Sequence, residues 1–482
     1  MSELPRQIPF RARLAFGLGE LGPAMAGSTL IFFLLIFLTD VAGLNPALAG
    51  SVLLIGKIWD AVNDPLIGWL ADKTRSRWGR RLPWILWSAL PFAILFTLHW
   101  WVPPYGLDAE RSQWSLFWHF VAISILFNTA YTAITLPYSA LLPELTHDYD
   151  ERSRLAGFRM GASLAGSIGG LLLALAVFSA LAAQPPQRQY FLYGALVAVV
   201  GLVSVAVCLL GIWKTALAAD SARRSERRAL ERGIPQPARK PSLRRQLAIV
   251  FSNRPYLLVC TIYLCSWLAL QFTATILPYY VTNWMGLGET DWQMVALVVQ
   301  GTAFLLIPLW SWLSVRLGKR LVYVLGMVFW VVAQFGLLFL ERGQTGLMFG
   351  LAFLAGFGVS VGYLIPNAML PDVMELDELE TGERREGVFF GFFVFLQKTA
   401  LALGTFIVGQ VLALAGYQAA GAGAGGVEQP ASALLAIRLA IGPLPMIALV
   451  LGVVACWLYP ITREKHAELL ERIEARKRGL AT

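Results

Sequence analysis

Two aspartates inside an apolar stretch are the residues best suited to chemistry in this sequence. Asp60 and Asp64 occur in the segment Lys57-Ile-Trp-Asp-Ala-Val-Asn-Asp-Pro-Leu-Ile-Gly68, within an apolar run of roughly 20 or more residues that is long enough to cross a bilayer as a helix. Because positions four apart on a helix differ by about 40°, the two carboxylates face the same way. Each charge at the bilayer centre costs about 2.5–3.5 kcal/mol on insertion scales. A small cation between the carboxylates would offset that cost.

Further oxygen ligands for such a cation lie nearby in the sequence. Na⁺ is a hard ion that takes oxygen ligands, and the Asn63 amide lies about 60° from Asp60 on the same helix. Thr132, in a later apolar span, offers a hydroxyl group from a neighbouring helix. The alternative interpretation is that Asp60 only pairs with Lys57 near a helix end, which leaves Asp64 unexplained. Paired carboxylates also serve H⁺ and Li⁺, so the coupling ion stays open between Na⁺ and these two.

Three other charged residues stand within apolar spans. Lys398 lies deep in such a span, where it would neutralise the carboxylates when no cation is bound; the alternative is a permanent ion pair. Arg159 has a planar guanidinium suited to a phosphate or carboxylate group, or to a structural pair with the acidic loop 144–152. Glu20 lies in a bent first span, where it is either a protonation site or part of a pair at a helix terminus.

The composition indicates a membrane protein. Of 482 residues, 57% are hydrophobic and only 14% are charged, whereas soluble domains average about 25% charged residues. The formal charge of +9 comes from basic residues in short segments between apolar spans, the positive-inside pattern, rather than from a nucleic-acid-binding surface. We expect a multi-pass protein of the inner (plasma) membrane with both termini cytoplasmic and no removable signal peptide.

Hydropathy predicts about twelve spans in two halves. The expected domains are an N-terminal six-helix bundle over residues 1–213, a cytoplasmic basic linker over 214–255, a C-terminal six-helix bundle over 256–460 and a cytoplasmic tail over 461–482. The linker is either an ordinary positive-inside loop or a segment that touches anionic lipid head groups. The predicted spans lie near residues 14–40, 46–71, 83–102, 114–141, 155–183, 191–213, 256–285, 292–315, 321–340, 345–370, 387–415 and 433–460.

The two halves resemble each other. The motif Leu136-Pro-Tyr-Ser-Ala-Leu-Leu-Pro-Glu144 follows the fourth span, and Ile365-Pro-Asn-Ala-Met-Leu-Pro-Asp372 follows the tenth. Matching motifs in corresponding spans indicate parallel six-span repeats with a solute site near the midplane, the architecture of a secondary transporter. Charges at the helix ends are either a cytoplasmic gate that latches and releases or merely solvated loops. The gate candidates are Asp72, Arg80, Glu144 and Asp372.

Enzyme chemistry is not expected. The sequence has no Walker-type Gly-rich loop ending in Lys-Ser/Thr, and its four cysteines and four histidines are scattered without a nucleophile–base or metal-ligand spacing. The cysteines read as small packing residues in apolar runs. We expect no cofactor and a monomer. The Gly- and Ala-rich segment 419–426 is expected to be a flexible external loop.

The segments around these charges resemble the melibiose-permease family, the glycoside–pentoside–hexuronide:cation symporters of the major facilitator superfamily. The matching segments are Trp59-Asp60-Ala-Val-Asn63-Asp64-Pro65, Thr74-Arg-Ser-Arg-Trp-Gly79 and Pro83-Trp84-Ile85. The resemblance implies an all-α major facilitator fold of twelve transmembrane helices in two six-helix bundles. It also implies cation ligands at Asp60, Asn63, Asp64 and Thr132, a coupling lysine at Lys398 and a substrate-side arginine at Arg159.

The sugar side departs from that family. Ala24, Thr135 and Ser139 stand where melibiose permease has a first-span Asp, its fourth-span partner and a sugar-packing Trp. Sugar hydroxyls need such acceptors for discrimination, which disfavours a melibiose-like substrate. Thr135 is nevertheless predicted to lie on the substrate side of the site.

A second resemblance fits this departure. The segments Pro137-Tyr-Ser-Ala-Leu141, Leu370-Pro-Asp-Val373, Phe389 to Lys398 and Ala415-Gly-Tyr417 are similar to the sodium-dependent lysophosphatidylcholine symporters, which also lack the sugar carboxylates. The resemblance implies an acyl-chain contact at Phe389 and Phe393, or ordinary aromatic packing against lipid, and a head-group contact at Gln271. We therefore predict a sodium-coupled symporter working by alternating access, for a lysophospholipid or similar small anionic amphiphile. The alternative is a Na⁺- or H⁺-coupled sugar or glycoside symporter; membrane lipids are the other expected partners.

Overall fold

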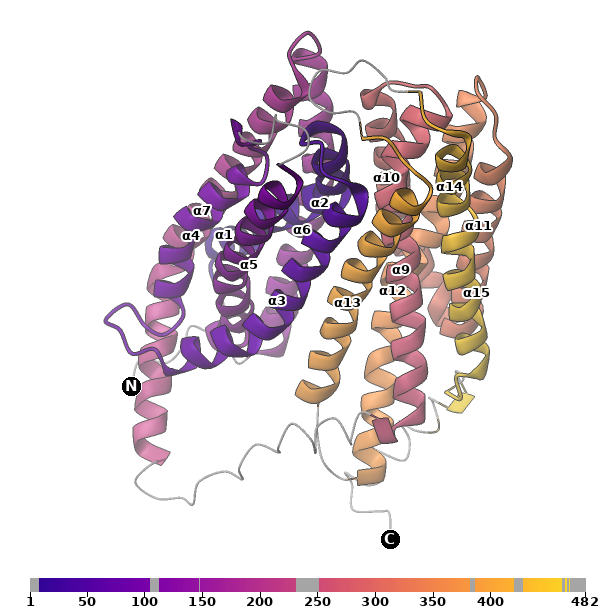
Figure 1. Cartoon of the computed structure of the whole chain (residues 1–482). Coiled ribbons are helices and arrows are strands. Elements are labelled where there is room, and N and C mark those ends of the chain that lie inside the picture. Colours follow the sequence, from indigo (N-terminus) through magenta and orange to yellow (C-terminus); the bar gives the residue numbers. More distant parts are fainter. Residues whose placement is uncertain are drawn as a thin grey trace. The chain divides into compact units, whose positions relative to one another are not determined.

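The computed structural model shows a helical chain in two compact units (Figure 1). It describes residues 8–104, 112–146, 148–230, 251–381, 386–419, 428–461, 464–465 and 468, and these contain no β-strand. Unit 1 comprises Met1–Ala238 and Tyr417–Glu428; unit 2 comprises Arg239–Gly416 and Gln429–Thr482. The main division therefore falls inside the predicted linker. Most of the predicted external loop 419–426 and of the predicted tail lies outside the described residues.

Unit 1 holds the first six predicted spans, drawn from indigo to pink in Figure 1. The first span is a bent pair, α1 and α2, which ends in a short π-helix. Asn45 caps α3 by accepting a hydrogen bond from the Ala47 amide at 2.9 Å, and Asp148 caps α6 in the same way. The elements are α1 (Phe10–Leu18), α2 (Leu21–Ile36), η1 (Phe37–Val41), α3 (Pro46–Lys73), α4 (Leu82–Leu98), α5 (Ser112–Leu145), α6 (Tyr149–Ala180) and α7 (Pro186–Leu230).

Unit 2 repeats this pattern of long apolar helices. Its fully buried aromatic residues include Tyr323 and Trp330, and the Tyr323 and Ser266 hydroxyls share a hydrogen bond of 2.9 Å. The elements are α9 (Arg254–Tyr279), η3 (Tyr280–Trp284), α10 (Glu289–Leu317), α11 (Lys319–Phe339), α12 (Thr345–Thr381), α13 (Glu386–Leu414), α14 (Ala431–Ile441) and α15 (Pro443–Leu458).

The helices are those of a multi-pass membrane protein. Among the described residues, ten helical segments are long and apolar enough to cross a bilayer. The remaining two predicted spans coincide with α3, which carries the charged motif, and with α4, an apolar helix of 17 residues. Large apolar side chains such as Leu210 and Leu305 are 82% and 75% exposed, which suits contact with lipid rather than water.

The packing of α3 on α5, and of α1 and α2 on α6, positions the polar residues of unit 1. α3 packs along α5, where the Trp59 indole donates a hydrogen bond of 2.9 Å to the Thr129 hydroxyl. Gly56 allows this close approach, because a Cβ there would lie only 3.1 Å from the Ser124 Cβ. α1 and α2 pack along α6. Arg13 pairs with Glu151 near the start of both spans, whereas the rings of Phe33 and Phe178 meet near their ends, so these helices run in the same direction.

Candidate cation site and the polar residues around it

The structure brings three of the predicted cation ligands together inside unit 1. The Thr132 hydroxyl oxygen on α5 lies 2.9 Å from Oδ1 of Asp60 and 3.1 Å from Oδ1 of Asp64, both on α3. Asp60 is 2% exposed and Asp64 is half-buried. A hydroxyl has one hydrogen and can donate it to only one of these oxygens at a time. Three oxygens therefore converge with one hydrogen among them, an arrangement that a cation would stabilise.

Lys57 belongs to the same cluster. Its Nζ lies 3.8 Å from Oδ2 of Asp60, so the predicted pairing of these two residues does occur. The pairing does not exclude the cation ligands, because Lys57 approaches Oδ2 whereas Thr132 approaches Oδ1. Asp60 thus presents one oxygen to the lysine and the other to the cluster that it forms with Asp64.

Asn63 lies on the same helix and is 1% exposed. Its amide nitrogen has no hydrogen-bond partner within the described part of the chain. Leaving a buried amide nitrogen without an acceptor costs about 1–3 kcal/mol, and such groups are rare unless they serve a function. No hydrogen bond between described residues joins Asn63 to Thr132, so its place among the ligands stays a prediction.

Sequence reasoning missed two features that shape this cluster. Pro65 lies inside α3 directly after Asp64, and since proline has no amide hydrogen, the carbonyl of Ala61 loses its usual partner within the helix. The second feature is the Trp59–Thr129 hydrogen bond, which ties α3 to α5 one turn from Thr132. The sequence held two signals for this hydrogen bond: Trp59 directly precedes Asp60, and Thr129 lies three residues before Thr132.

No transition-metal centre is visible in the ranges that the structure describes. Within them, no three His, Cys, Asp or Glu side chains gather closely enough to hold a metal ion. The four cysteines are free and buried in apolar surroundings. A cation at Asp60 and Asp64 would therefore depend on a mixed set of carboxylate, hydroxyl and amide or carbonyl oxygens.

Arg159 forms an ion pair that the sequence did not predict. Its Nε lies 2.7 Å from Oε2 of Glu20, at the bend between α1 and α2, rather than in the acidic loop 144–152. The guanidinium also lies 5.3 Å from the centroid of the Tyr138 ring. The side chains of Arg159 and Glu20 are 29% and 14% exposed. Thr135, one turn before Tyr138 on α5, donates its hydroxyl hydrogen to the backbone carbonyl of Tyr131 at 3.0 Å.

We expect the Glu20–Arg159 pair to couple the two residues energetically. Glu20→Gln and Arg159→Gln should each destabilise unit 1, and the double variant should lose less than the sum by about 0.5–3 kcal/mol, because either single change leaves one partly buried charge without its partner. Thermal unfolding of the four proteins measures this coupling. Arg188→Gln, which alters an exposed arginine near the start of α7, is the control. Additive losses would show that the pair makes no energetic contribution.

The predicted substrate residues of unit 2 are buried in its interior. The Phe393 ring stacks on Tyr263 with centroids 3.6 Å apart, and the Tyr256 hydroxyl donates to the carbonyl of Phe389 at 2.6 Å. Both phenylalanines therefore take part in the packing of α13 on α9, and an acyl-chain contact at these residues stays a prediction.

Gln271 also lies in this packing layer. It is 2% exposed and donates through Nε2 to the hydroxyls of Thr275 and Thr405, both at 2.8 Å. Its Oε1 has no hydrogen-bond partner among the described residues. Lys398 lies on α13 of the same unit with a partly buried side chain. Whether these residues contact a substrate stays a prediction.

The four predicted gate residues lie in two clusters. In unit 1, Asp72 and Glu144 both pair with Arg80 and Arg81, with Arg81 Nη2 2.7 Å from Asp72 and 3.2 Å from Glu144. In unit 2, Asp372 pairs with Lys319 at 2.7 Å. Sequence reasoning missed the role of Lys319, although it is a basic residue at the start of a helix.

These two clusters occupy corresponding places. Each joins the start of the third span of its unit to the C-terminal part of the fourth: α4 to α5 in unit 1, and α11 to α12 in unit 2. The acidic partner follows a proline in both cases, Pro143 and Pro371. The correspondence supports the prediction of parallel repeats.

The fold and the polar cluster define a class of protein, a multi-pass membrane transporter with ionisable groups inside its helices. The family described as MFS/sugar transport protein matches residues 15–463. The chain therefore belongs to this family of the major facilitator superfamily, and the predicted family resemblance is confirmed.

Relatives of known description are symporters and importers. The chain is 42% identical to an uncharacterised symporter of Synechocystis sp., over 98% of both chains. It is 27% identical to the sodium-dependent lysophosphatidylcholine symporter 1-A of Danio rerio, over 96% of this chain and 88% of that one. It is also 26% identical to a candidate sulfoquinovose importer of Salmonella typhimurium, over 98% and 95% of the two chains.

Solved transporters share the fold. The nucleoside transporter NupG superposes with a TM-score of 0.60 at 14% identity, covering 94% of this chain and 100% of that one. A proton-dependent oligopeptide transporter gives 0.61 at 15% identity, covering 95% and 99%. The protein is thus a major facilitator transporter of symporter type, whose family and structural neighbours are transporters rather than enzymes.

Proposed function

We propose that this protein is a sodium-coupled symporter for a lysophospholipid or a similar anionic amphiphile. The observation that carries the sodium site is the convergence of Asp60, Asp64 and Thr132, three oxygens that share one hydroxyl hydrogen. A hard monovalent cation among them would offset the repulsion of two carboxylates in an apolar helix. Asn63 and the carbonyl of Ala61 would add oxygens at the same level of α3.

Coupling then follows from linkage. If sodium raises the affinity for the solute, the solute must raise the affinity for sodium by the same factor. Lys398 is the proposed coupling residue: its charge would compensate the carboxylates in the sodium-free state and would be replaced by sodium. The predicted gate residues Asp72, Arg80, Glu144 and Asp372 would then break and remake their ion pairs as access alternates.

The amphiphile is favoured by chemistry and by relationship. The Danio rerio relative is named for lysophosphatidylcholine, and this chain has Ala24 where a sugar-binding aspartate stands in melibiose permease. Arg159 would meet a phosphate or carboxylate once its pair with Glu20 opens. Gln271, Phe389, Phe393 and Thr135 are the further proposed substrate-side positions.

A sugar or glycoside, carried with Na⁺ or H⁺, is the second candidate. The family description includes sugar transport, and the Salmonella typhimurium relative is a candidate importer of sulfoquinovose, an acidic sugar derivative. Arg159 suits its sulfonate as well as it suits a phosphate. Anion recognition is thus common to both candidates, and the rest of the solute distinguishes them.

Uptake into proteoliposomes tests the proposal. An inward sodium gradient should drive the accumulation of radiolabelled lysophosphatidylcholine, and collapse of that gradient by a sodium ionophore should abolish it. Sulfoquinovose and a panel of neutral glycosides are measured alongside. Accumulation driven only by a proton gradient would contradict sodium coupling, and accumulation of sugars alone would reverse the order of the two substrates.

A further inference from the structure

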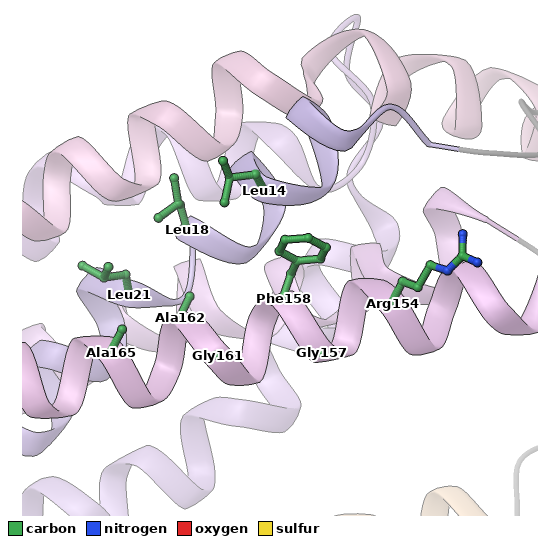
Figure 2. A pocket seen from close by; sticks show the side chains of 9 residues that line it. All are labelled: Leu14, Leu18, Leu21, Arg154, Gly157, Phe158, Gly161, Ala162 and Ala165. Atoms are coloured by element: carbon green, nitrogen blue, oxygen red, sulfur yellow. The ribbon is translucent and has the colours of Figure 1, made fainter. Parts of the chain in front are cut away.

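An apolar groove runs along α1, α2 and α6 of unit 1 (Figure 2). Its volume is about 510 Å³. Leu14, Leu18 and Leu21 line one side, and Phe158 on α6 lines the other. Figure 2 shows Arg154 at one end of the row of α6 residues that line the groove. The groove thus has a long apolar part and a cationic end.

The groove is open rather than filled by neighbouring side chains. A Cβ built at Gly157 or Gly161, two of its lining residues, would meet no atom within 4 Å. Leu14, on the opposite side, is 41% exposed. Where an open apolar surface of this kind faces the bilayer core, hydrocarbon covers it, because water is absent there.

The direction of the helices places the cationic end at a membrane surface. The spans that include α1 and α6 begin at Phe10 and Arg154, and they run in the same direction, as their paired contacts show. Arg154 therefore lies at the level of lipid phosphates, and the groove extends from it toward the hydrocarbon core along Leu14, Leu18 and Leu21.

The charges at this end favour an anion. Arg154 donates to Oε1 of Glu151 at 2.9 Å and remains 52% exposed, whereas the same carboxylate pairs with Arg13 through Oε2 at 3.5 Å. Two guanidinium groups thus share one carboxylate. Arg11, exposed at the start of α1, lies within about 20° of Leu18 around the helix and adds a third cation on the groove side.

We propose that this groove binds an anionic phospholipid of the surrounding bilayer, with an acyl chain along Leu14, Leu18 and Phe158 and its phosphate beside Arg154. Basic pockets between transmembrane helices recognise lipid head groups in this way. The lipid is a bound partner rather than a transported solute, so the proposal is independent of the substrate and of sodium. Because it binds the folded state, it should stabilise the protein.

Thermal unfolding of the delipidated full chain in detergent tests this. Dioleoyl phosphatidylglycerol should raise the unfolding midpoint by about 2–4 °C more than dioleoyl phosphatidylcholine does. Gly161→Leu, which fills the groove, should remove the response to both lipids. Its matched control is Gly301→Leu on α10, where a Cβ also meets nothing within 4 Å but no groove residue is altered.

The arginine is tested separately. Arg154→Gln should abolish the preference for phosphatidylglycerol, whereas Arg316→Gln, which removes an exposed arginine of unit 2, should retain it. A wild-type response in Gly161→Leu, or an unchanged lipid preference in Arg154→Gln, would overturn the proposal. So would stabilisation by lysophosphatidylcholine alone, dependent on sodium and lost in Gly161→Leu, because the groove would then belong to the transported solute.

If Gly161→Leu does not fold, a second measurement still tests the proposal. Native mass spectrometry of the purified wild type should show one retained anionic phospholipid, and Arg154→Gln should lose it while Arg316→Gln keeps it. Equal retention in both arginine variants would also overturn the proposal.

Discussion

Asp60→Asn is expected to abolish sodium-stimulated uptake and to lower sodium affinity by at least about a hundredfold. The reason is electrostatic: one unit charge about 4 Å from a cation contributes about 4 kcal/mol at an effective dielectric of about 20, and each 1.4 kcal/mol is tenfold in affinity. Asp64→Asn should act in the same direction but more weakly, because Asp64 is half-buried whereas Asp60 is 2% exposed. Uptake in proteoliposomes and sodium-dependent thermal stabilisation both measure the effect.

Three variants show whether the loss is specific to the site. Asp291→Asn changes a carboxylate that accepts from the Gly288 amide at the start of α10, and it should leave sodium affinity unchanged. Thr132→Ser keeps the hydroxyl and should bind sodium. Thr132→Val has the same shape but no hydroxyl, so it should bind sodium more weakly than Thr132→Ser. If Asp60→Asn and Asp64→Asn both retain sodium-stimulated uptake, the cation does not bind at these carboxylates.

The arrangement of this cluster was largely predictable from sequence because it depends on helical geometry. The four-residue spacing of Asp60 and Asp64 fixes their common direction once the segment is helical, and the structure places both beside Thr132. The chain position of each apolar span was likewise set by hydropathy, which is strong when a helix must face lipid. Among the described residues, ten helices have the length and composition of a membrane span. The predicted count of twelve stays a prediction.

Ion pairs between residues of different helices were harder to predict from the sequence. Glu20 and Arg159 each had several plausible partners, and only the packing of the α1–α2 bend on α6 selects one of them. The gate residues show the same limit: Asp372 has a basic partner at Lys319, which belongs to a different helix with no local spacing to indicate it. The apolar groove depends on three helices at once, so no pattern within one segment could reveal it.

The contact between α2 and α6 leads to the second large effect. Gly166 packs so closely on α2 that a Cβ there would collide with the backbone carbonyl oxygen of Leu21, which a helix cannot move aside. Small residues at such crossings let membrane helices approach, and the packing that they permit is what holds the helices together. Gly166→Leu is therefore expected to destabilise unit 1 by at least about 1–3 kcal/mol, the usual range for overpacking, or to prevent folding. Thermal unfolding of delipidated protein measures this.

The matched control lies on the same helix. Gly161→Leu adds the same side chain to α6, in open space rather than against backbone, so delipidated protein should unfold within about 0.5 kcal/mol of the wild type, as at an ordinary surface position. Any loss caused by residue type alone would appear in both variants. Equal destabilisation would mean that the approach of α2 to α6 does not depend on Gly166, whereas a large difference ties the stability of the bundle to this crossing. That crossing also fixes where Glu20 meets Arg159, so the same substitution should weaken their coupling.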